Sequence, residues 1–102
     1  LVIVRESQGG RDLDKFADEQ RASIAERMPI AKSVKEGKTK IAGLDAREQE
    51  FAVTLEHPMP ALTQWHAWLV RDGYCYHICA TSPRERAAKE QKEFKALLDS
   101  WK

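Results

Sequence analysis

The apolar and polar positions in the first part of the chain predict a strand followed by a helix. Residues 1–6 begin with a continuous apolar, β-branched run, which favours a central strand of a sheet. Residues 7–10 form a turn, and Asp12 is a suitable N-cap for a helix. Apolar side chains then recur at helical spacing until Pro29, which ends the helix; they are Leu13, Phe16, Ala17, Ile24 and Met28.

The middle of the chain alternates in the manner of strands. We expect two short strands, 30–36 and 38–42, around Gly37, and then a turn over 43–45. Residues 46–55 form a further strand. One face of that strand carries Gln49, Phe51, Val53 and Leu55, and the other carries Glu48 and Glu50. Two prolines place a loop at 57–60.

Residues 62–70 and 74–81 predict a β-hairpin, because Asp72-Gly73 joins two runs rich in aromatic and aliphatic residues. A two-residue turn pairs Val70 with Cys75, Trp68 with His77 and His66 with Cys79. One face is apolar: Trp65, Ala67, Leu69, Tyr76, Ile78 and Ala80. We expect its large side chains, Trp65, Leu69, Tyr76 and Ile78, to pack against Phe16, Phe94 and Leu98.

The chain ends on a predicted amphipathic helix. Ser82 and Glu85 match a capping box, and Pro83 suits the first helical position. The apolar stripe comprises Ala87, Gln91, Phe94, Leu97, Leu98 and Trp101. The element order predicts one α+β domain over 1–102: a mostly antiparallel sheet with one face covered by two amphipathic helices.

Charge and hydropathy narrow the class of protein. The net charge is +1, from 17 basic and 16 acidic residues, so there is no basic field for nucleic acid. The lysines at 32, 35, 38 and 40 favour a solvated hairpin or edge strand over a phosphate site. No apolar run is long enough for direct membrane insertion. The chain does not begin with Met, so we expect further N-terminal residues.

The residues that resemble chemical motifs do not predict an enzyme, a metal site or a cofactor. Gly37-Lys38-Thr39 resembles the end of a P-loop, but Lys32 stands where the first glycine belongs. Cys75, His77 and Cys79 share a strand face, yet the two thiols lie on the order of 13 Å apart in an intact strand, too far for one zinc ion or a disulfide. A hydrolase using Cys79 and His66 remains an alternative.

The second face of the hairpin indicates protein binding. It carries Gln64, His66, Trp68, Val70, Cys75, His77 and Cys79, a mixture without the charges of a solvated face. Trp68 beside hydrogen-bonding groups is typical of a groove for another protein. Alternatively, upstream residues cover this face. Gln20 interrupts the apolar stripe of the first helix, and a stripe-edge position is the alternative explanation.

The order of several short motifs resembles the DcrB-like family, and within it the Eag chaperones of bacterial type VI secretion. The motifs are 12–20 leading to Met28-Pro29, then 41–48, 64–73, 80–83 and 94–101. The resemblance implies a PsbP-like fold, an α/β sandwich in which helices back a curved, mostly antiparallel sheet. It also implies that this chain is the larger, C-terminal part of that domain, with the N-terminal strands missing. His66, Cys75 and Cys79 depart from the family's usual aliphatic or aromatic residues.

The resemblance also implies a function. Eag chaperones are cytoplasmic homodimers that shield the N-terminal transmembrane helices of an effector and aid its loading onto the secretion spike. Groove glutamines of the family match Gln20 and Gln64, and Met28 matches an aliphatic groove position. The expected partner-binding residues are Gln20, Ile24, Met28, Gln64, His66 and Trp68. The alternative is a periplasmic or lipid-anchored DcrB-like envelope protein without catalytic activity.

Overall fold

The computed structural model describes residues 2–27, 31–53 and 61–100. The strands are β1 (Val2–Ser7), β2 (Ala31–Ile41), β3 (Leu44–Val53), β4 (Leu62–Arg71) and β5 (Tyr74–Pro83). The helices are α1 (Leu13–Arg27), the short 3-10 helix η1 (Arg84–Arg86) and α2 (Ala87–Asp99). No helix in these ranges combines the length and apolarity needed to cross a membrane.

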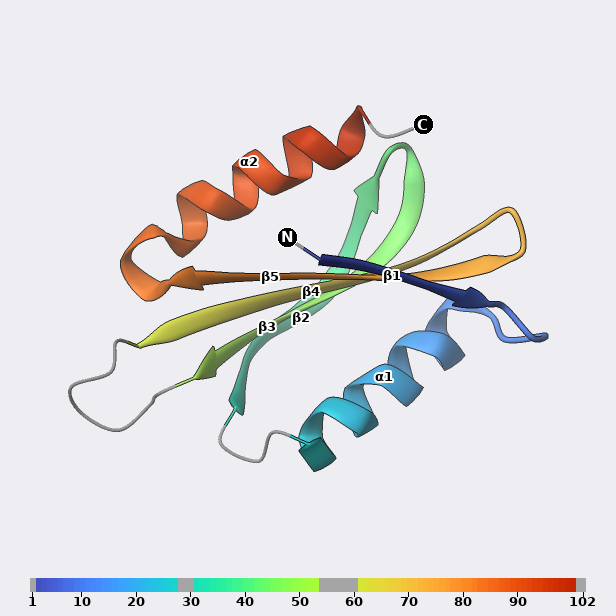
Figure 1. Cartoon of the computed structure of the whole chain (residues 1–102), viewed down its shortest axis with the longest axis horizontal. Coiled ribbons are helices and arrows are strands. Elements are labelled where there is room, and N and C mark those ends of the chain that lie inside the picture. The colour runs from blue at the N-terminus through green and yellow to red at the C-terminus, as the bar shows by residue number, and fades with distance from the viewer. Residues whose placement is uncertain (1, 28–30, 54–60, 101–102) are drawn as a thin grey trace.

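The strands form one five-stranded antiparallel sheet in the order β1-β5-β4-β3-β2 (Figure 1). The α+β class and the antiparallel sheet are therefore confirmed. β2 lies at one edge with its lysines exposed, as the lysine pattern predicts. β1 lies at the other edge, so its predicted central position is wrong.

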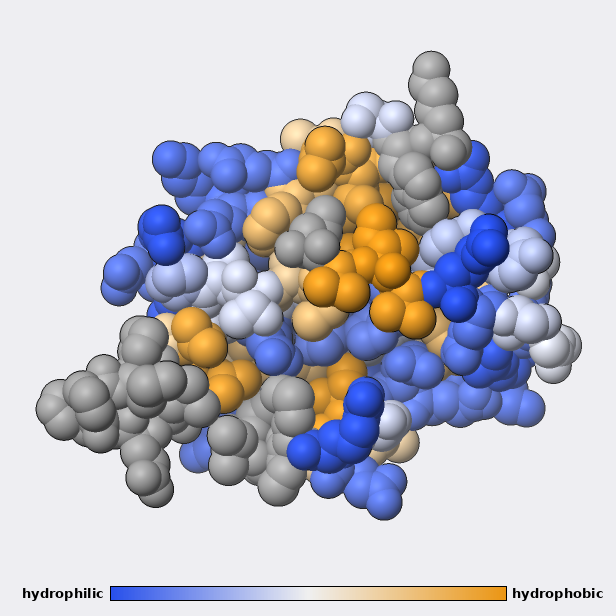
Figure 2. All heavy atoms as spheres, viewed as in Figure 1, coloured by the Kyte–Doolittle hydropathy of each residue, from blue (hydrophilic) through white to orange (hydrophobic). Residues whose placement is uncertain are grey.

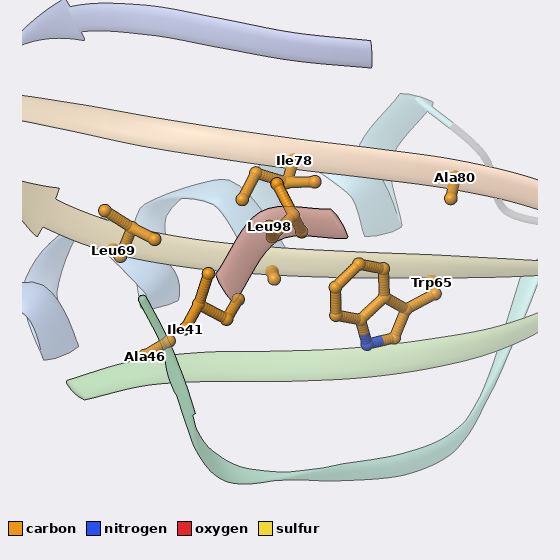
Figure 3. Close-up of a cluster of buried hydrophobic side chains, with 8 residues drawn as sticks. Ile41, Ala46, Trp65, Leu69, Ile78, Ala80 and Leu98 are labelled. Atoms are coloured by element: carbon orange, nitrogen blue, oxygen red, sulfur yellow. The ribbon is translucent and has the colours of Figure 1, made fainter. Parts of the chain in front are cut away.

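The two helices cover opposite faces of the sheet, α2 on one side and α1 on the other (Figure 1). Beneath α2, a cluster of apolar side chains fills the space between helix and sheet (Figure 3): Ile41, Ala46, Trp65, Ala67, Leu69, Ile78, Ala80 and Leu98. Beneath α1, the buried cluster is Phe16, Ala17, Ile24, Phe51, Trp68 and Cys75. The chain is therefore a three-layer α/β/α arrangement, with the smaller cluster under α1.

The opposite placement of the helices shows that the prediction of two helices on one face is wrong, and it corrects one predicted contact. Phe94 and Leu98 pack on the face of Trp65, as expected, but Phe16 packs on the other face with Trp68. The physical reason is that each face of β4 carries a large apolar side chain, Trp65 on one and Trp68 on the other, so each can bury a helix. Sharing one face between two helices would have left Trp68 in water.

Two local predictions are also wrong. β2 runs straight through Gly37, which pairs with Glu48 and needs no turn because the long ladder with β3 holds it extended. Ser82 caps no helix; it is buried in β5 and pairs with Thr63, and Pro83 ends the strand opposite Leu62. The chain turns at Arg84 into η1 before α2 begins.

Other local predictions are confirmed. Asp12 Oδ1 accepts a hydrogen bond from the backbone N–H of Lys15 at 2.8 Å, which is the expected N-cap of α1. Asp72 and Gly73 both have positive φ, 52° and 80°, as a tight type I′ turn requires. The β4–β5 register follows directly from this turn. The hairpin is thus the element that local sequence determines best.

Candidate functional site

A cluster of polar side chains lies on the α1 face of β4 and β5. The register pairs Trp68 with His77 and His66 with Cys79. His66 and His77 are therefore diagonal neighbours, and His66 Nδ1 lies 2.8 Å from His77 Nε2. His66 Nε2 lies 3.2 Å from Gln64 Oε1. We call His66, His77 and Gln64 the histidine cluster.

The hydrogen bonds assign the protons of the two rings. Gln64 Oε1 can only accept, so neutral His66 carries its proton on Nε2, and its Nδ1 accepts from His77 Nε2–H. Burial lowers the pKa of His66 to about 4, with His77 and Arg27 acting in the same direction. Burial and Arg27 also lower the pKa of His77, against an opposing effect of Glu6. Both rings are therefore neutral at pH 7.

Cys79 lies beside the histidine cluster, but its contact with His66 differs from that of a catalytic cysteine with its general base. Its Sγ lies 3.9 Å from His66 Nε2, the nitrogen that donates to Gln64. Burial raises the pKa of Cys79, whereas a catalytic thiolate requires a lowered pKa. The other nitrogen of His66 meets His77 rather than an orienting carboxylate. This geometry does not favour the hydrolase alternative.

The cluster does not converge on a metal ion either. Cys79 approaches one nitrogen of His66 and His77 approaches the other, so no single point lies within bonding distance of all three. Within residues 2–27, 31–53 and 61–100, no group of three His, Cys, Asp or Glu side chains could hold a metal. Cys75 and Cys79 are free thiols, and Cys75 is packed in the cluster under α1.

Helix α1 covers much of the face that the sequence assigns to a binding groove. Trp68 is fully buried and Ile24 is 2% exposed, so the expectation that they line an open surface is wrong. The reason is that Phe16 and Ile24 bury their own side chains against Trp68 and its neighbours. His66 is also buried. Met28 lies outside the described residues.

Gln20 and Gln64 are half-buried and lie at the margin of this covered region. A pocket of about 70 Å³ opens between α1 and β1, lined by Val4, Glu6, Phe16, Gln20 and His77. Gln64 is linked to this pocket through His66, which hydrogen-bonds to both Gln64 and His77. The structure therefore brings Gln20 and the histidine cluster to one place, the boundary between α1 and β1.

β1 itself forms the open side of the site. Val2, Ile3 and Val4 are 60%, 43% and 55% exposed, although all three are large apolar residues. Figure 2 shows an apolar patch near the centre of the view, in the region where β1 crosses in front of the sheet in Figure 1. Isolated exposed apolar residues are ordinary, but three consecutive ones on an edge strand make β1 a candidate interaction surface.

The backbone of β1 is also open on its outer side. The N–H of Gln8 donates to Gly73 O, and hydrogen-bonding groups alternate along a strand, so those of Val2, Val4 and Glu6 face β5. The groups of Ile3 and Arg5 therefore face away from the sheet, and on the same side Ser7 O accepts a hydrogen bond from Arg11 Nη2 at 2.6 Å. Such a row of backbone donors and acceptors can pair with an added strand.

Sequence reasoning missed two of these features. A signal for the His66–His77 contact was present, because the predicted register already makes these residues diagonal neighbours on one face. No local signal places β1 at an edge, because that depends on its long-range pairing with β5. An apolar run is expected both in a central strand and in an edge strand that a partner covers, so the run alone does not distinguish the two positions.

Comparison with known proteins identifies a shared fold. No family model matches the chain. No curated protein matches it. Among solved structures, that of PA94 from Pseudomonas aeruginosa, a protein of unknown function, matches with a TM-score of 0.77 at 16% sequence identity. The match covers 98% of this chain and 69% of that chain, and at this identity the similarity concerns the fold alone.

Proposed function

We propose that this chain is a chaperone and adaptor that shields the N-terminal transmembrane helices of a type VI secretion effector and helps to load the effector onto the spike. The observation that carries the proposal is the exposed apolar surface of β1 beside the pocket lined by Gln20 and His77. A guest that must be kept from water needs an apolar surface of this kind.

The side chains at this surface suit an apolar guest. Val2 and Val4 project on the α1 face of β1, since they pair with Cys79 and His77. Burying a valine contributes roughly 1.5–3 kcal/mol. The pocket has room for about two waters or one small aliphatic side chain, so we infer that a guest helix lies across the surface and inserts one side chain. The Gln20 amide offers hydrogen bonds to that guest.

We also propose that the chain acts in the cytoplasm as a homodimer, without catalytic activity or a cofactor. Reducing conditions in the cytoplasm keep Cys75 and Cys79 as thiols. The outward-facing backbone groups of β1 support the addition of a strand from a second copy. The raised pKa of Cys79 supports a binding role over a catalytic one.

Two matched valines allow a direct binding test. Val4 lines the pocket and Val34 lies on β2 at the opposite edge, and they are 55% and 59% exposed. The probe is a fluorescent 20-residue Leu/Ala helix with lysines at both ends. We expect Val4→Asp to weaken its binding at least about tenfold through lost apolar contact. Gln20→Ala should weaken it by roughly two- to tenfold through a lost hydrogen bond.

The control is Val34→Asp, which introduces the same charge at an equally exposed valine and should bind the probe like wild type. The proposal fails if wild type does not bind the peptide, or if Val4→Asp binds it as tightly as wild type. It also fails if Val34→Asp loses as much affinity as Val4→Asp, because the loss would then reflect charge alone. Circular dichroism of each variant confirms that the fold is intact.

A further inference from the structure

The layer between α1 and the sheet combines apolar side chains with polar groups that are incompletely hydrogen-bonded. Within the described ranges, three buried polar atoms lack a hydrogen-bond partner: Arg21 Nε, Gln49 Oε1 and Trp68 Nε1. All three belong to α1 or to the sheet face beneath it. The layer under α2 is instead filled by apolar side chains. Unsatisfied buried groups weaken packing, so these three atoms offset part of the stabilisation that the apolar contacts of α1 provide.

The His66–His77 pair lies within this layer between α1 and the sheet. The two ring centroids are 5.0 Å apart, and Trp68 stacks beside them at 5.9 Å from His66 and 5.5 Å from His77. Phe51 meets the His66 ring edge-on at 5.5 Å. Trp68 and Phe51 also contact the apolar side of α1. Movement of the histidine pair would therefore disturb the surface on which α1 rests.

The groups that face the pair disfavour positive charge on it. From α1, Arg27 lowers the pKa of both rings, and Arg21 lies 5.3 Å above the Trp68 ring. From β1, Glu6 acts in the opposite direction on His77. The remaining neighbours are Gln64 on β4, Cys79 on β5 and Gln49 on β3, none of which is an acid. Among the described residues, no carboxylate hydrogen-bonds to either ring.

We propose that the His66–His77 pair is a proton-operated latch for α1, which stays packed while the rings share their hydrogen bond and detaches when both rings are charged. Because Phe16 and Gln20 form one wall of the pocket beside β1, detachment of α1 dismantles the pocket. For guest binding, this inference rests on the proposed function. For the movement of α1, it stands independently.

The hydrogen bonds predict that two protons are needed to open the latch. A first proton can enter at His77 Nδ1 and leave the bond from His77 Nε2–H to His66 Nδ1 in place. A second proton must enter at His66 Nδ1, which turns the acceptor into a donor that faces another donor. Two cations at this separation also repel each other. Opening should therefore depend more steeply on pH than a single titration.

Hydrogen exchange of the full chain tests the latch without any guest. After correction for intrinsic exchange rates, opening of α1 (13–27) should increase at least about tenfold between pH 7.5 and 5.0, since each unit of pKa difference shifts an equilibrium tenfold. Protection of α2 (87–99) should stay constant and serves as the internal reference. If α1 and α2 lose protection together, or α1 keeps its protection, the latch is disproved.

Two variants separate titration from structural damage. His66→Asn keeps an acceptor near the position of Nδ1, and His77→Gln keeps a donor near Nε2, but neither side chain titrates. In His66→Asn, α1 should remain protected at pH 5.0. In His77→Gln, where burial still lowers the pKa of His66, α1 should open with a single titration instead of the steeper wild-type profile. The control is His57→Asn, which removes the chain's remaining histidine and should open like wild type. If either latch variant that is folded at pH 7.5 opens with the wild-type pH profile, the proposal is overturned.

The guest is tested separately with the fluorescent Leu/Ala helix. We expect its affinity for wild type to fall at least about tenfold from pH 7.5 to 5.0, and its affinity for His66→Asn to stay constant. Equal pH dependence in both proteins would overturn the link between latch and pocket. If the peptide fails to bind even at pH 7.5, the proposed function fails, while the exchange experiment still decides the movement of α1.

Discussion

Ala42 shows how much conformational strain one residue of this fold accepts. It precedes Gly43 in the turn between β2 and β3, and its φ is +53°. A side chain with a Cβ is disfavoured in this left-handed region, by roughly 1–2 kcal/mol for most residues. The backbone N–H of Ala42 donates to Asp99 Oδ1 at 3.0 Å, which ties this turn to the end of α2.

Ala42→Asn should therefore stabilise the protein. Asn tolerates the left-handed conformation and is preferred at the first position of a type I′ turn, and it keeps the N–H that Asp99 accepts. We expect a gain of roughly 0.5–1 kcal/mol in the free energy of unfolding, measured by urea titration with an unchanged m-value. The same change at the exposed helical position Ala96 should instead destabilise. A loss of stability in Ala42→Asn would contradict this explanation.

His66 makes stability depend on pH. Its pKa is 6.5 in the unfolded chain and about 4 in the folded one, so below pH 6.5 the unfolded state binds more protons. The stabilisation is thus complete above pH 6.5 and is lost as the pH falls towards 4. The full effect is on the order of 3 kcal/mol. Urea titrations at pH 7.5 and 4.5 should show that wild type loses more stability than His66→Asn. An equal loss would mean that His66 does not contribute.

Among the elements, α1 decides which side chains a partner can reach. Because Trp68 is fully buried beneath it, a charge at Trp68 cannot act as a simple surface change. Trp68→Glu should destabilise the fold, by on the order of 4 kcal/mol or more, since a carboxylate would be buried without a partner. Thermal unfolding measures this, with Leu97→Glu at an exposed position of α2 as the control. A Trp68→Glu protein as stable as wild type would show that α1 does not cover this site in solution.

The elements also show where sequence reasoning succeeds. The β4–β5 hairpin was predictable because Asp72-Gly73 sets both the turn and the register locally. The residues on each face of the hairpin were also predictable, because successive side chains of a strand point to opposite faces. The assignment of α1 to the Trp68 face was not, because both faces of β4 carry a tryptophan that a helix can bury and only three-dimensional packing chooses between them. The capping box at Ser82 failed because pairing with Thr63 extends β5 past it.

At the scale of the whole molecule, the proposed homodimer would form through the open edge of β1. The N–H of Arg5 points away from the sheet, whereas that of Val4 faces β5. Arg5→Pro should therefore remove a donor from the open edge, leave the sheet intact and yield a monomer in analytical ultracentrifugation. Val4→Pro should destabilise the sheet itself. A wild-type monomer at high micromolar concentration, or an Arg5→Pro dimer, would show that this edge is not the interface.

The two edges of the sheet differ in a way that limits growth. β2 carries Lys32, Lys35, Lys38 and Lys40 on its exposed edge and is broken by an irregularity between Ser33 and Lys35. Charged side chains and bulges oppose strand addition, so only β1 can recruit a neighbour. A subunit whose sheet accepts an added strand at both edges can assemble into filaments. A subunit that accepts one at a single edge forms only a closed dimer. Replacing the β2 lysines with threonines should therefore convert a finite complex into a polymerising one.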